Sequence, residues 1–377
     1  MALARVLSAM SGGVDSSVAT ALLVREGHDV VGVSLQLSDE SAGGAVSRCC
    51  SSADLRDARL VAGALGIPYY VVNEEAAFDR EVRGPFIEAY REGRTPNPCV
   101  RCNSSLKFGR LLQLARSIGA SRVATGHYAR LCGDPLTGRH RLQRALDRVK
   151  DQSYFLFELD DEQREAALFP MGGKSKVEAY GLAAEFGLPV AGKPESQDLC
   201  FIPGGDTRGW LQEKVGAAPT GEIVDSAGRL LGRHRGIHEF TIGQRRGLGV
   251  SSRRPLYVVS VDASEHRVVV GEAEALESFG LIASSCRLHD PALWEGPFRA
   301  EARIRSRHAG TSATVTPLPG GDLAVAFDVP QRAVTPGQAV VLYHDDLVLG
   351  GGWIARAGLD SSLKRPVACE VIDSGRA

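Results

Sequence analysis

The chain has 377 residues, of which 44% are hydrophobic and 24% are charged. These values predict a soluble globular protein of two or three domains. No stretch approaches the roughly 20 apolar residues of a membrane span, and the N-terminus lacks the pattern of a secretory signal. We therefore expect a cytoplasmic protein, and the formal net charge of −1 gives no general indication of nucleic-acid binding.

The first half of the chain alternates between short apolar strands and helical stretches. Strands are expected at 5–10, 29–37, 68–73 and 121–130, and helices at 16–26, 52–66, 74–93 and 104–119. This alternation predicts an α/β fold with a doubly wound parallel sheet. Ligands of such sheets bind beyond the carboxyl ends of the strands, where a glycine-rich turn follows the first strand.

The second half has short β-branched runs separated by Gly, Pro and Asp, a pattern that predicts β-rich modules including a small barrel. A linker-like stretch at 201–210 precedes them. We place domain boundaries near 205 and 290. The expected domains are an α/β domain at 1–204, a central β-rich domain at 205–289, a C-terminal barrel-like domain at 290–360 and a mobile tail at 361–377.

Basic residues gather locally although the net charge is near zero. The stretches 137–150 and 229–247 carry many cations and few acids. Arg303, Arg305 and Arg307 alternate, so on a strand they would share one face. Such runs are either solvated surface or contacts for an RNA backbone, and the residues alone leave both interpretations open. His308 follows the arginines as a candidate for stacking or for a sugar contact.

The chain has eight cysteines, at positions Cys49, Cys50, Cys99, Cys102, Cys132, Cys200, Cys286 and Cys369. Without a secretory signal a structural disulfide framework is not expected, so the thiols are reactive, metal-binding or simply buried. Cys99 and Cys102 form a C-x-x-C motif. It is half of a zinc or iron–sulfur site if Cys49, Cys50 and Cys200 complete it, or it forms a local disulfide. We favour plain thiol chemistry.

The sequence SGGVDS at 11–16 lies between a strand and a helix, where backbone N–H groups and the helix dipole favour an anion. It lacks the lysine of a Walker loop. Asp15 would repel a bare phosphate, so we interpret it as a Mg²⁺ ligand or a phosphate-orienting group. The turn resembles the pyrophosphate loop of the ATP pyrophosphatase superfamily. This resemblance implies an adenine-nucleotide hydrolase-like fold, cleavage of ATP between its α- and β-phosphates, and adenylation of a carbonyl oxygen. Such a loop holds a leaving pyrophosphate and needs no lysine for γ-phosphoryl transfer.

Six further segments indicate one family. They are TPNPCVRCNSSLKF (95–108), ATGHYAR (124–130), KDQSYFL (150–156), KPESQDLCFI (193–202), FTIGQRRGLG (240–249) and PLYVV (255–259). Together they resemble the tRNA-specific 2-thiouridylases, and the resemblance spans most of the chain. It implies an ATP-dependent tRNA-uridine 2-sulfurtransferase that replaces the C2 oxygen of the wobble uridine with sulfur. In such an enzyme the domain at 1–204 would be the ATP-pyrophosphatase catalytic domain, and the central domain at 205–289 would bind tRNA.

The resemblance also implies roles for individual residues. Cys200 would carry a persulfide, Cys102 would be the nucleophile, and the two would form a transient disulfide as sulfur leaves. Two distant cysteines beside Pro, Gly or polar residues suit this division of labour. Cys102 also precedes the helix expected near Ser104, whose dipole would lower the pKa of the thiol.

The expected ligand contacts follow from the same resemblance. ATP would contact Ala9, Met10, Ser11, Gly12, Gly13, Val14, Asp15, Ser16, Leu35 and Gly126, with Mg²⁺ at Asp15. The tRNA would contact Asn97, Pro98, Cys99, Lys150, Asp151, Gln152, Arg305, Ser306 and Arg307, and an extruded target base would lie near Asn97 and Pro98. Arg245 and Arg246 offer similar cations. The family often has aspartate at the position of Cys99, so this position departs from its pattern.

The implied partners are tRNAs of the Lys, Glu or Gln type and a persulfide donor such as a cysteine desulfurase or a sulfur-relay protein. Two other functions are open to test. An amide-forming ATP pyrophosphatase would need an ammonia source, shows no N-terminal cysteine glutaminase pattern here, and does not account for Cys102 and Cys200. A nucleotide-sensing RNA-binding protein without chemistry would keep full biological activity after Cys200→Ser.

Overall fold

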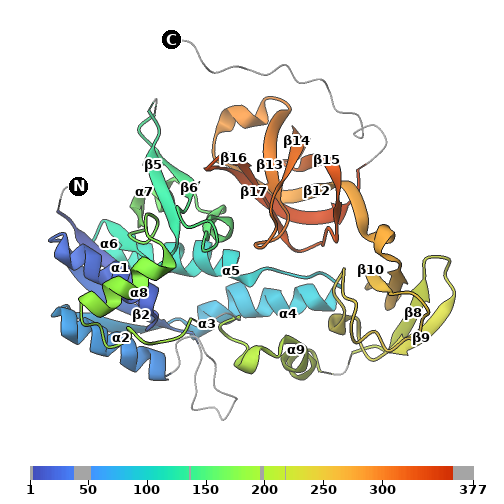
Figure 1. Cartoon of the computed structure of the whole chain (residues 1–377), viewed down its shortest axis with the longest axis horizontal. Coiled ribbons are helices and arrows are strands. Elements are labelled where there is room, and N and C mark those ends of the chain that lie inside the picture. The colour runs from blue at the N-terminus through green and yellow to red at the C-terminus, as the bar shows by residue number, and fades with distance from the viewer. Residues whose placement is uncertain (1–2, 38–51, 136, 196–198, 217, 360–377) are drawn as a thin grey trace. The chain divides into compact units, whose positions relative to one another are not determined.

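The computed structural model describes residues 3–37, 52–135, 137–195, 199–216 and 218–359. The chain divides into two compact units, and Figure 1 labels many of their helices and strands. The first unit contains residues 1–86, 98–213 and 346–348, and the second contains residues 87–97, 214–345 and 349–377. Cys49, Cys50, Cys369 and the tail expected at 361–377 lie outside the described residues.

A five-stranded parallel sheet forms the centre of the first unit. β1 and β2 are buried along almost their whole length, as expected for strands covered on both faces. The predicted α/β parallel sheet is therefore confirmed. The strand order is β3-β2-β1-β4-β7, with β1 at Arg5–Ala9, β2 at Asp29–Gln36, β3 at Tyr69–Asn73, β4 at Arg122–Ala124 and β7 at Ala167–Leu168.

Helices pack around this sheet through apolar side chains. α1 (Val14–Arg25), α2 (Ser52–Leu65) and α8 (Lys176–Glu185) share one cluster that includes Val18 and Val61. No helix of the described ranges is long and apolar enough to cross a membrane. Further helical elements between residues 75 and 205 are α3 Glu75–Phe78, the π-helix η2 Asp79–Arg83, α4 Gly84–Arg91, the 3₁₀ helix η4 Ser153–Leu156, α7 Asp161–Ala166 and the 3₁₀ helix η5 Pro203–Gly205.

Helical structure runs from Pro98 to Ser117 without a break, as α5 (Pro98–Arg101), the π-helix η3 (Cys102–Arg110) and α6 (Leu111–Ser117). It begins earlier than the expected helix at 104–119, because proline at the first helical position costs no hydrogen bond. Cys102 therefore lies inside the helical run. The expected position ahead of a helix N-terminus is wrong for Cys102, and Cys99 occupies the first turn instead.

The stretch 201–210 is not a linker. Phe201 is 6% exposed, and its ring centroid lies 5.2 Å from that of Phe86 and 5.4 Å from that of Trp210. The helix α9 (Thr207–Val215) begins inside this stretch and carries Trp210. The Pro and Gly residues suggested a flexible connection, but the burial of aromatic rings fixes this segment on the first unit.

The basic stretch 137–150 includes a strand of the hairpin formed by β5 (Ala129–Gly133) and β6 (His140–Arg144). Three of its arginines have acidic partners: Arg139 lies 2.7 Å from Asp161, Arg141 pairs with Asp134, and Arg148 pairs with Asp346. These pairs favour the interpretation of this stretch as a charged surface whose positive charge is locally neutralised.

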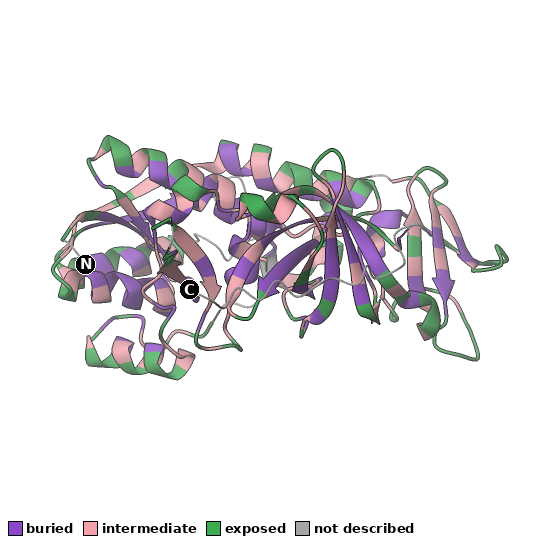
Figure 2. Ribbon diagram, turned by 90° about the horizontal axis from the view of Figure 1, so that it is seen from above, coloured by how far each residue is buried: buried purple, intermediate pink, exposed green. Residues whose placement is uncertain are grey.

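The second unit contains a four-stranded sheet and a six-stranded antiparallel barrel, so the β-rich second half is confirmed. Figure 2 shows the buried residues concentrated along their strands. The sheet has the order β10-β11-β8-β9, with β8 at Gly221–Asp225, β9 at Leu230–His234, β10 at Tyr257–Asp262 and β11 at Arg267–Gly271. Short turns η6 (Ile237–Glu239), η7 (Ala273–Leu276) and η8 (Pro291–Trp294) connect strands.

The barrel closes because β12 pairs with β17 as well as with β15. β12 (Glu277–Leu288) is thus a barrel strand that lies ahead of the domain boundary expected near 290. The other barrel strands are β13 Phe298–Arg303, β14 Thr311–Pro317, β15 Leu323–Arg332, β16 Ala339–His344 and β17 Leu347–Ala357, in the order β12-β15-β14-β13-β16-β17.

The three alternating arginines do not share a strand face. β13 ends at Arg303, and the exposed Arg305 and Arg307 lie in the turn after it. The turn forms because the Arg303 guanidinium donates back to the carbonyl oxygens of Ser306 (2.7 Å) and His308 (2.9 Å). The expected strand alternation is therefore wrong.

His308 is also not placed for stacking on a base. It is 9% exposed, its Nε2 lies 3.0 Å from Oε1 of Gln331, and its Nδ1 accepts from the backbone N–H of Gly310. The ring is held inside the barrel turn, so a role in base or sugar contact is not favoured.

Candidate active site

The glycine turn joins β1 to α1 in the shape of an anion-binding loop. Gly12 has a φ of +71°, and a Cβ atom there would lie 2.2 Å from the carbonyl oxygen of Asp54, so the position requires glycine. Gly13 is the N-cap of α1 and has an extended backbone. Because the first N–H groups of a helix have no partner within it, the turn presents them with the positive end of the helix dipole.

Serine hydroxyls and a close backbone contact hold the turn in shape. Ser16 Oγ donates to the carbonyl oxygen of Gly13 and accepts from the backbone N–H of Ser11, both at 3.1 Å. Ser17 Oγ donates to the same Gly13 oxygen at 2.8 Å. A Cβ atom at Gly126 would lie 2.6 Å from the backbone nitrogen of Ser16. The end of β4 therefore approaches the turn as closely as glycine permits.

A first cavity, of about 220 Å³, opens beside the turn. Val33 and Leu35 of β2 give it an apolar wall, which suits an adenine ring, while Cys102 and Lys107 enter from the helical run. The residues expected to contact ATP that line this cavity are Ala9, Met10, Ser11, Asp15, Ser16, Leu35 and Gly126.

A second cavity, also of about 220 Å³, borders the same turn. Gly13 and Val14 line it together with Asp15. Two lysines from distant segments, Lys176 and Lys193, line it as well. The sequence analysis identified neither lysine, yet both bring positive charge to the loop.

A third cavity, of about 210 Å³, brings three cysteines together. Cys99 and Cys102 line it from the helical run, and Cys200 lines it from the segment ahead of η5. Cys102 also lines the first cavity and Cys200 the second, while Gln152 borders all three. Cys102 and Cys200 are separate thiols in this structure, not a disulfide.

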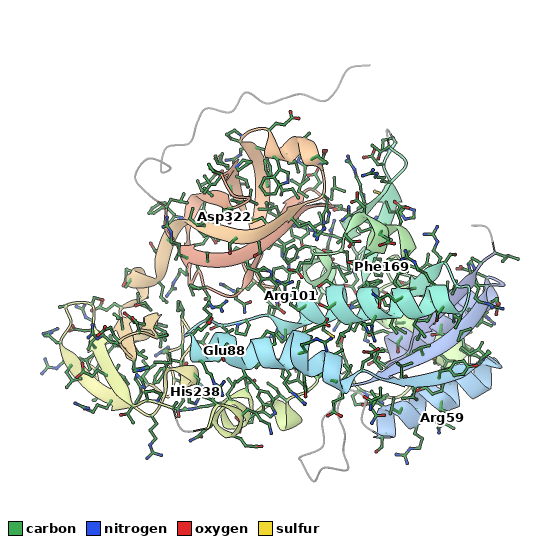
Figure 3. All side chains as sticks on the ribbon, turned by 180° about the vertical axis from the view of Figure 1, so that it is seen from behind. Arg59, Glu88, Arg101, Phe169, His238 and Asp322 are labelled. Atoms are coloured by element: carbon green, nitrogen blue, oxygen red, sulfur yellow. The ribbon has the colours of Figure 1, made fainter. Side chains whose placement is uncertain are left out.

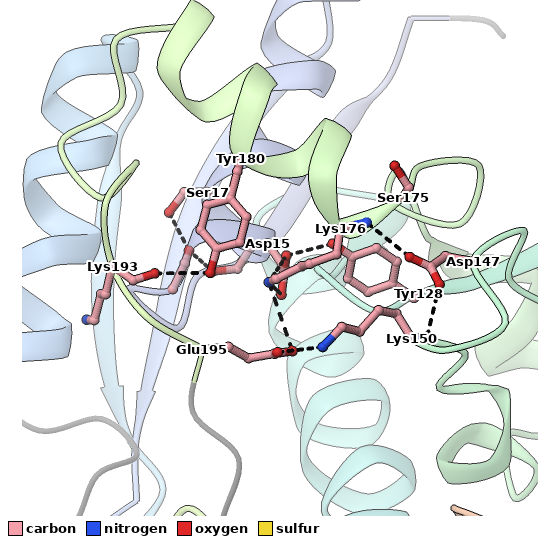
Figure 4. A network of polar contacts seen from close by, with 12 residues as sticks. Asp15, Ser17, Tyr128, Asp147, Lys150, Ser175, Lys176, Tyr180, Lys193 and Glu195 are labelled. Carbon is pink, nitrogen blue, oxygen red and sulfur yellow. Dashed lines mark hydrogen bonds and ion pairs between the residues drawn. The ribbon is translucent and has the colours of Figure 1, made fainter.

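Asp15 is the centre of a polar network, which Figure 4 shows. Lys176 Nζ donates to both of its carboxylate oxygens, at 2.7 and 2.8 Å, and the Tyr128 hydroxyl donates to Oδ1 at 2.8 Å. Burial and the negative charge of Asp15 raise the pKa of Tyr128 far above its ordinary value, so this hydroxyl remains a donor. Ser175 and Glu178 form a capping box that fixes the start of α8. This S-x-x-E pattern is visible in the sequence, and it would have predicted a helix that begins at Lys176.

Lys193 fastens the turn to α2. Its ammonium donates to the carbonyl oxygen of Gly12 (3.0 Å), to Asp54 (2.7 Å) and to Asp57 (2.6 Å). Burial works against the charge, but the two aspartates raise the pKa of Lys193 above its ordinary value. Lys193 is therefore a charged positioning residue that joins the loop to its neighbouring helix.

A neutral histidine lies among the residues around Cys102. His127 is buried, its Nδ1 lies 2.8 Å from the Thr125 hydroxyl, and its ring packs against Phe169, which Figure 3 labels. Burial and the nearby charge of Lys107 hold the pKa of His127 well below its ordinary value. π-helical turns such as the one that carries Cys102 and Lys107 are frequent at functional sites.

The three residues expected to contact tRNA at 150–152 have different local partners. Lys150 forms an ion pair with Glu195 at 2.6 Å. Asp151 accepts from the backbone N–H groups of Ala145 and Ser153, so its carboxylate holds the loop together. Gln152 borders all three cavities, and its Oε1 accepts a hydrogen bond from the backbone N–H of Tyr128.

The other residues expected to contact tRNA lie partly in the second unit. Pro98 and Cys99 border the third cavity in the first unit, whereas Asn97 belongs to the second unit. In the second unit Arg305 and Arg307 are exposed and Ser306 lies between them. The expected cations Arg245 and Arg246 are exposed there too.

In the part of the chain that the structure describes, the cysteines do not form a metal site. Within those ranges no group of three or more His, Cys, Asp or Glu residues is placed to hold a metal ion. Cys49 and Cys50, which the zinc or iron–sulfur alternative requires, are outside those ranges.

Three domain families match consecutive parts of the chain. Residues 4–204 match the family described as "tRNA methyl transferase HUP domain". Residues 208–272 match "tRNA methyl transferase PRC-barrel domain", and residues 278–354 match "Aminomethyltransferase beta-barrel domain". The parallel sheet with its glycine turn is thus a HUP domain, followed by two β-rich domains.

Curated relatives identify the family more closely. The tRNA-specific 2-thiouridylase MnmA of Geobacter metallireducens is 50% identical over 361 residues, covering 94% of this chain and 97% of the relative. The enzyme of the same name from Acidobacterium capsulatum is 48% identical over 367 residues, covering 93% and 98%. A solved 4-thiouridine synthetase–RNA complex with bound ATP has a TM-score of 0.35 and 15% identity, covering 56% of this chain and 50% of the other.

The chain therefore belongs to the family of tRNA-specific 2-thiouridylases. The expectation of a tRNA-modifying sulfurtransferase is confirmed by this membership.

Proposed function

We propose that the protein is an ATP-dependent sulfurtransferase that replaces the C2 oxygen of the wobble uridine in tRNA with sulfur. The observation that carries this proposal is the position of Cys102. This residue lines both the cavity beside the glycine turn and the cavity that Cys200 lines. Candidate residues for oxygen activation and for sulfur delivery therefore meet within one unit.

The first half-reaction activates the uridine. Its C2 oxygen attacks the α-phosphorus of ATP, and the bond from that phosphorus to the bridging oxygen of pyrophosphate breaks. Backbone N–H groups of the turn and the positive end of α1 stabilise the departing pyrophosphate. Leu35 and Gly126 contact the nucleoside part of ATP in this proposal.

Asp15 is the residue that fits a magnesium ion bound with ATP. Mg²⁺ commonly takes one or two protein carboxylates together with phosphate oxygens. Asp15 lines both cavities at the turn, so its carboxylate faces the space assigned to the phosphates. The ion would neutralise phosphate charge there.

The second half-reaction delivers sulfur. The terminal sulfur of a Cys200 persulfide attacks C2, and AMP leaves with the original oxygen. The Cys102 thiolate then attacks the inner sulfur of Cys200, and the bond to the transferred sulfur breaks with its electron pair left on that sulfur. The products are 2-thiouridine, AMP and a Cys102–Cys200 disulfide, which external thiols reduce. A persulfide donor, such as a cysteine desulfurase or a sulfur-relay protein, reloads Cys200.

The tRNA contacts belong to both units. Thiolation at C2 requires the target base to leave the anticodon stack. In the first unit Pro98, Cys99, Lys150 and Gln152 are the candidates, and Asp151 shapes their loop. In the second unit the candidates are Asn97, Arg305, Ser306 and Arg307. The proposed substrates are tRNAs of the Lys, Glu or Gln type.

The test is thiolation by the purified protein. Unmodified tRNA, Mg-ATP and a persulfide donor are incubated with the protein, and 2-thiouridine is measured by mass spectrometry after digestion of the RNA. We expect 2-thiouridine, and we expect Cys102→Ser and Cys200→Ser each to abolish it.

Cys132→Ser is the matched control, because Cys132 is a partly buried thiol on β5 in the same unit that lines none of the three cavities. It should keep full activity. Formation of AMP without 2-thiouridine would leave adenylation standing and contradict the sulfur steps. Absence of AMP would contradict the function assigned to the glycine turn.

A further inference from the structure

Asn103 is a buried polar residue to which the proposed reaction assigns no step. It follows Cys102 directly on the π-helix η3 and is 2% exposed. It also lines the third cavity, together with Cys99, Cys102 and Cys200. Buried polar side chains normally have hydrogen-bond partners, so an unpaired group at such a position requires an explanation.

One end of the Asn103 side chain is fixed and the other end is unpaired. Its Nδ2 donates to the carbonyl oxygen of Phe155 at 3.0 Å. Because a carbonyl oxygen can only accept, this contact determines which end of the amide carries the nitrogen. Oδ1, at the other end, is buried and has no hydrogen-bond partner within the described residues. A ligand that brings an N–H group into the cavity would satisfy this oxygen.

The wall of the third cavity suits a flat base. Phe78, Phe155 and Phe201 line it, and the cavity has a volume of about 210 Å³. Proteins that hold an extruded base pack it between aromatic or apolar side chains and recognise its Watson–Crick edge through hydrogen bonds. The aromatic wall therefore supplies the packing surface, and the unpaired oxygen of Asn103 supplies an acceptor for that edge.

Two other polar side chains of this wall already have partners for a named atom. Gln152 Oε1 accepts from the backbone N–H of Tyr128 at 3.0 Å. Nδ1 of His127 lies 2.8 Å from the Thr125 hydroxyl. These atoms are engaged within the protein, whereas Oδ1 of Asn103 remains for a ligand.

We propose that Asn103 is a specificity-determining residue that accepts a hydrogen bond from the N3–H group of the extruded uracil. This assignment rests on the proposed function. N3 is bonded to C2, the carbon that exchanges oxygen for sulfur, and Asn103 is the neighbour of Cys102 in the chain. Cytosine has no hydrogen at N3 and presents a lone pair there, which Oδ1 repels. A site built to accept from a substrate N–H rejects analogues without it, so the contact selects uracil.

The test removes the donor from the substrate and the acceptor from the protein. One tRNA carries uridine at the wobble position and the other carries 3-deazauridine, which replaces N3–H with C–H and keeps the C2 oxygen. Thiolation is measured as kcat/KM with the full-length protein, Mg-ATP and a persulfide donor. The unchanged protein should prefer uridine by on the order of tenfold or more. Equal values for the two tRNAs would overturn the proposal.

Asn103→Leu should lower kcat/KM for the uridine tRNA by on the order of tenfold and abolish the preference, because the acceptor is absent. Asn103→Asp is nearly isosteric and keeps an acceptor oxygen, so it should retain a preference for uridine. A merely structural role would lower kcat/KM for both tRNAs by the same factor. A preference in Asn103→Leu as large as that of the unchanged protein would therefore overturn the proposal.

Ser104→Ala is the matched control. Ser104 is the next residue of the same π-helix, its hydroxyl donates to the carbonyl oxygen of Val100 at 3.2 Å, and it lines none of the three cavities. This variant should keep the full preference for uridine, and its loss there would contradict the assignment to Asn103. Failure of the unchanged protein to thiolate the uridine tRNA would instead overturn the proposed function, which separates the two failures.

Discussion

Gly12 has a backbone conformation that strains any other residue, and a carbonyl oxygen also blocks the space beside it. Gly12→Ala should lower the free energy of unfolding and slow thiolation by on the order of a hundredfold, because the turn can no longer keep its shape. Gly66→Ala is the control, since Gly66 has a φ of +68° but open space around it. It should cost about 1 kcal/mol and leave thiolation intact. Urea unfolding and the thiolation assay measure both, and equal effects of the two variants would contradict the steric argument.

His127 makes the stability of the protein depend on pH. The folded protein keeps this ring neutral because burial and Lys107 hold its pKa well below the ordinary value. The unfolded chain takes up a proton below about pH 6.5, so it binds more protons there and the free energy of unfolding falls as the pH drops.

His127→Gln removes this proton uptake. Its loss of stability between pH 7.5 and 5.5 should be smaller than that of the unchanged protein by about 1 kcal/mol. Urea unfolding at the two pH values gives the comparison, and His234 and His308, whose pKa values burial also lowers, are present in both proteins and cancel. Identical pH dependence in the two proteins would show that His127 titrates normally.

At the site, the sequence predicted residues of local motifs but not their distant partners. Asp15 was identifiable because it belongs to a local motif. Its partner Lys176 lies 161 positions away, and no periodicity or spacing connects the two. Cys102 and Cys200 were found by resemblance to a family, but only folding shows that both line the third cavity.

At the scale of elements, strongly patterned segments were predicted well and boundaries were not. β1, α1 and β2 follow from apolar runs around a glycine turn. The helical run at 98–117 begins earlier than the helix expected at 104–119, because proline is favourable at the first position of a helix. The stretch 201–210 was wrongly predicted to be a linker, because its Pro and Gly residues suggested flexibility. In the structure the aromatic contacts of Phe201 and Trp210 hold it in place.

Phe201 is the anchor that fixes the Cys200 segment. Phe201→Ala should lower the free energy of unfolding by about 3–5 kcal/mol, because a buried ring is lost from the cluster with Phe86 and Trp210. Phe279→Ala is the control, since Phe279 is 64% exposed and its loss should change stability by about 0.5 kcal/mol or less. Urea unfolding measures both variants. A small effect at Phe201 would mean that the segment is not fixed by aromatic packing.

At the scale of the whole molecule, the formal net charge of −1 means that tRNA affinity must come from local cations. Arginines of the stretch 137–150 pair with acids, which removes much of its positive charge. Composition could not separate this stretch from the turn after β13, because only the fold decides which cations have acidic neighbours. In that turn the exposed Arg305 donates a hydrogen bond to the carbonyl oxygen of Arg332. A carbonyl oxygen carries no formal charge, so this contact does not neutralise the guanidinium of Arg305.

Arg305 should therefore contribute to tRNA binding through a phosphate. Each phosphate contact releases condensed counterions, so Arg305→Ala should weaken tRNA binding and reduce the slope of log K against log salt by about 1. Arg299→Ala is the control on the same barrel, because Arg299 is neutralised by Asp328 at 2.8 Å and should leave the slope unchanged. Binding is measured by filter retention across a salt series. If both variants changed the slope equally, the effect would come from net charge alone; if neither changed it, tRNA would not contact this turn through phosphate.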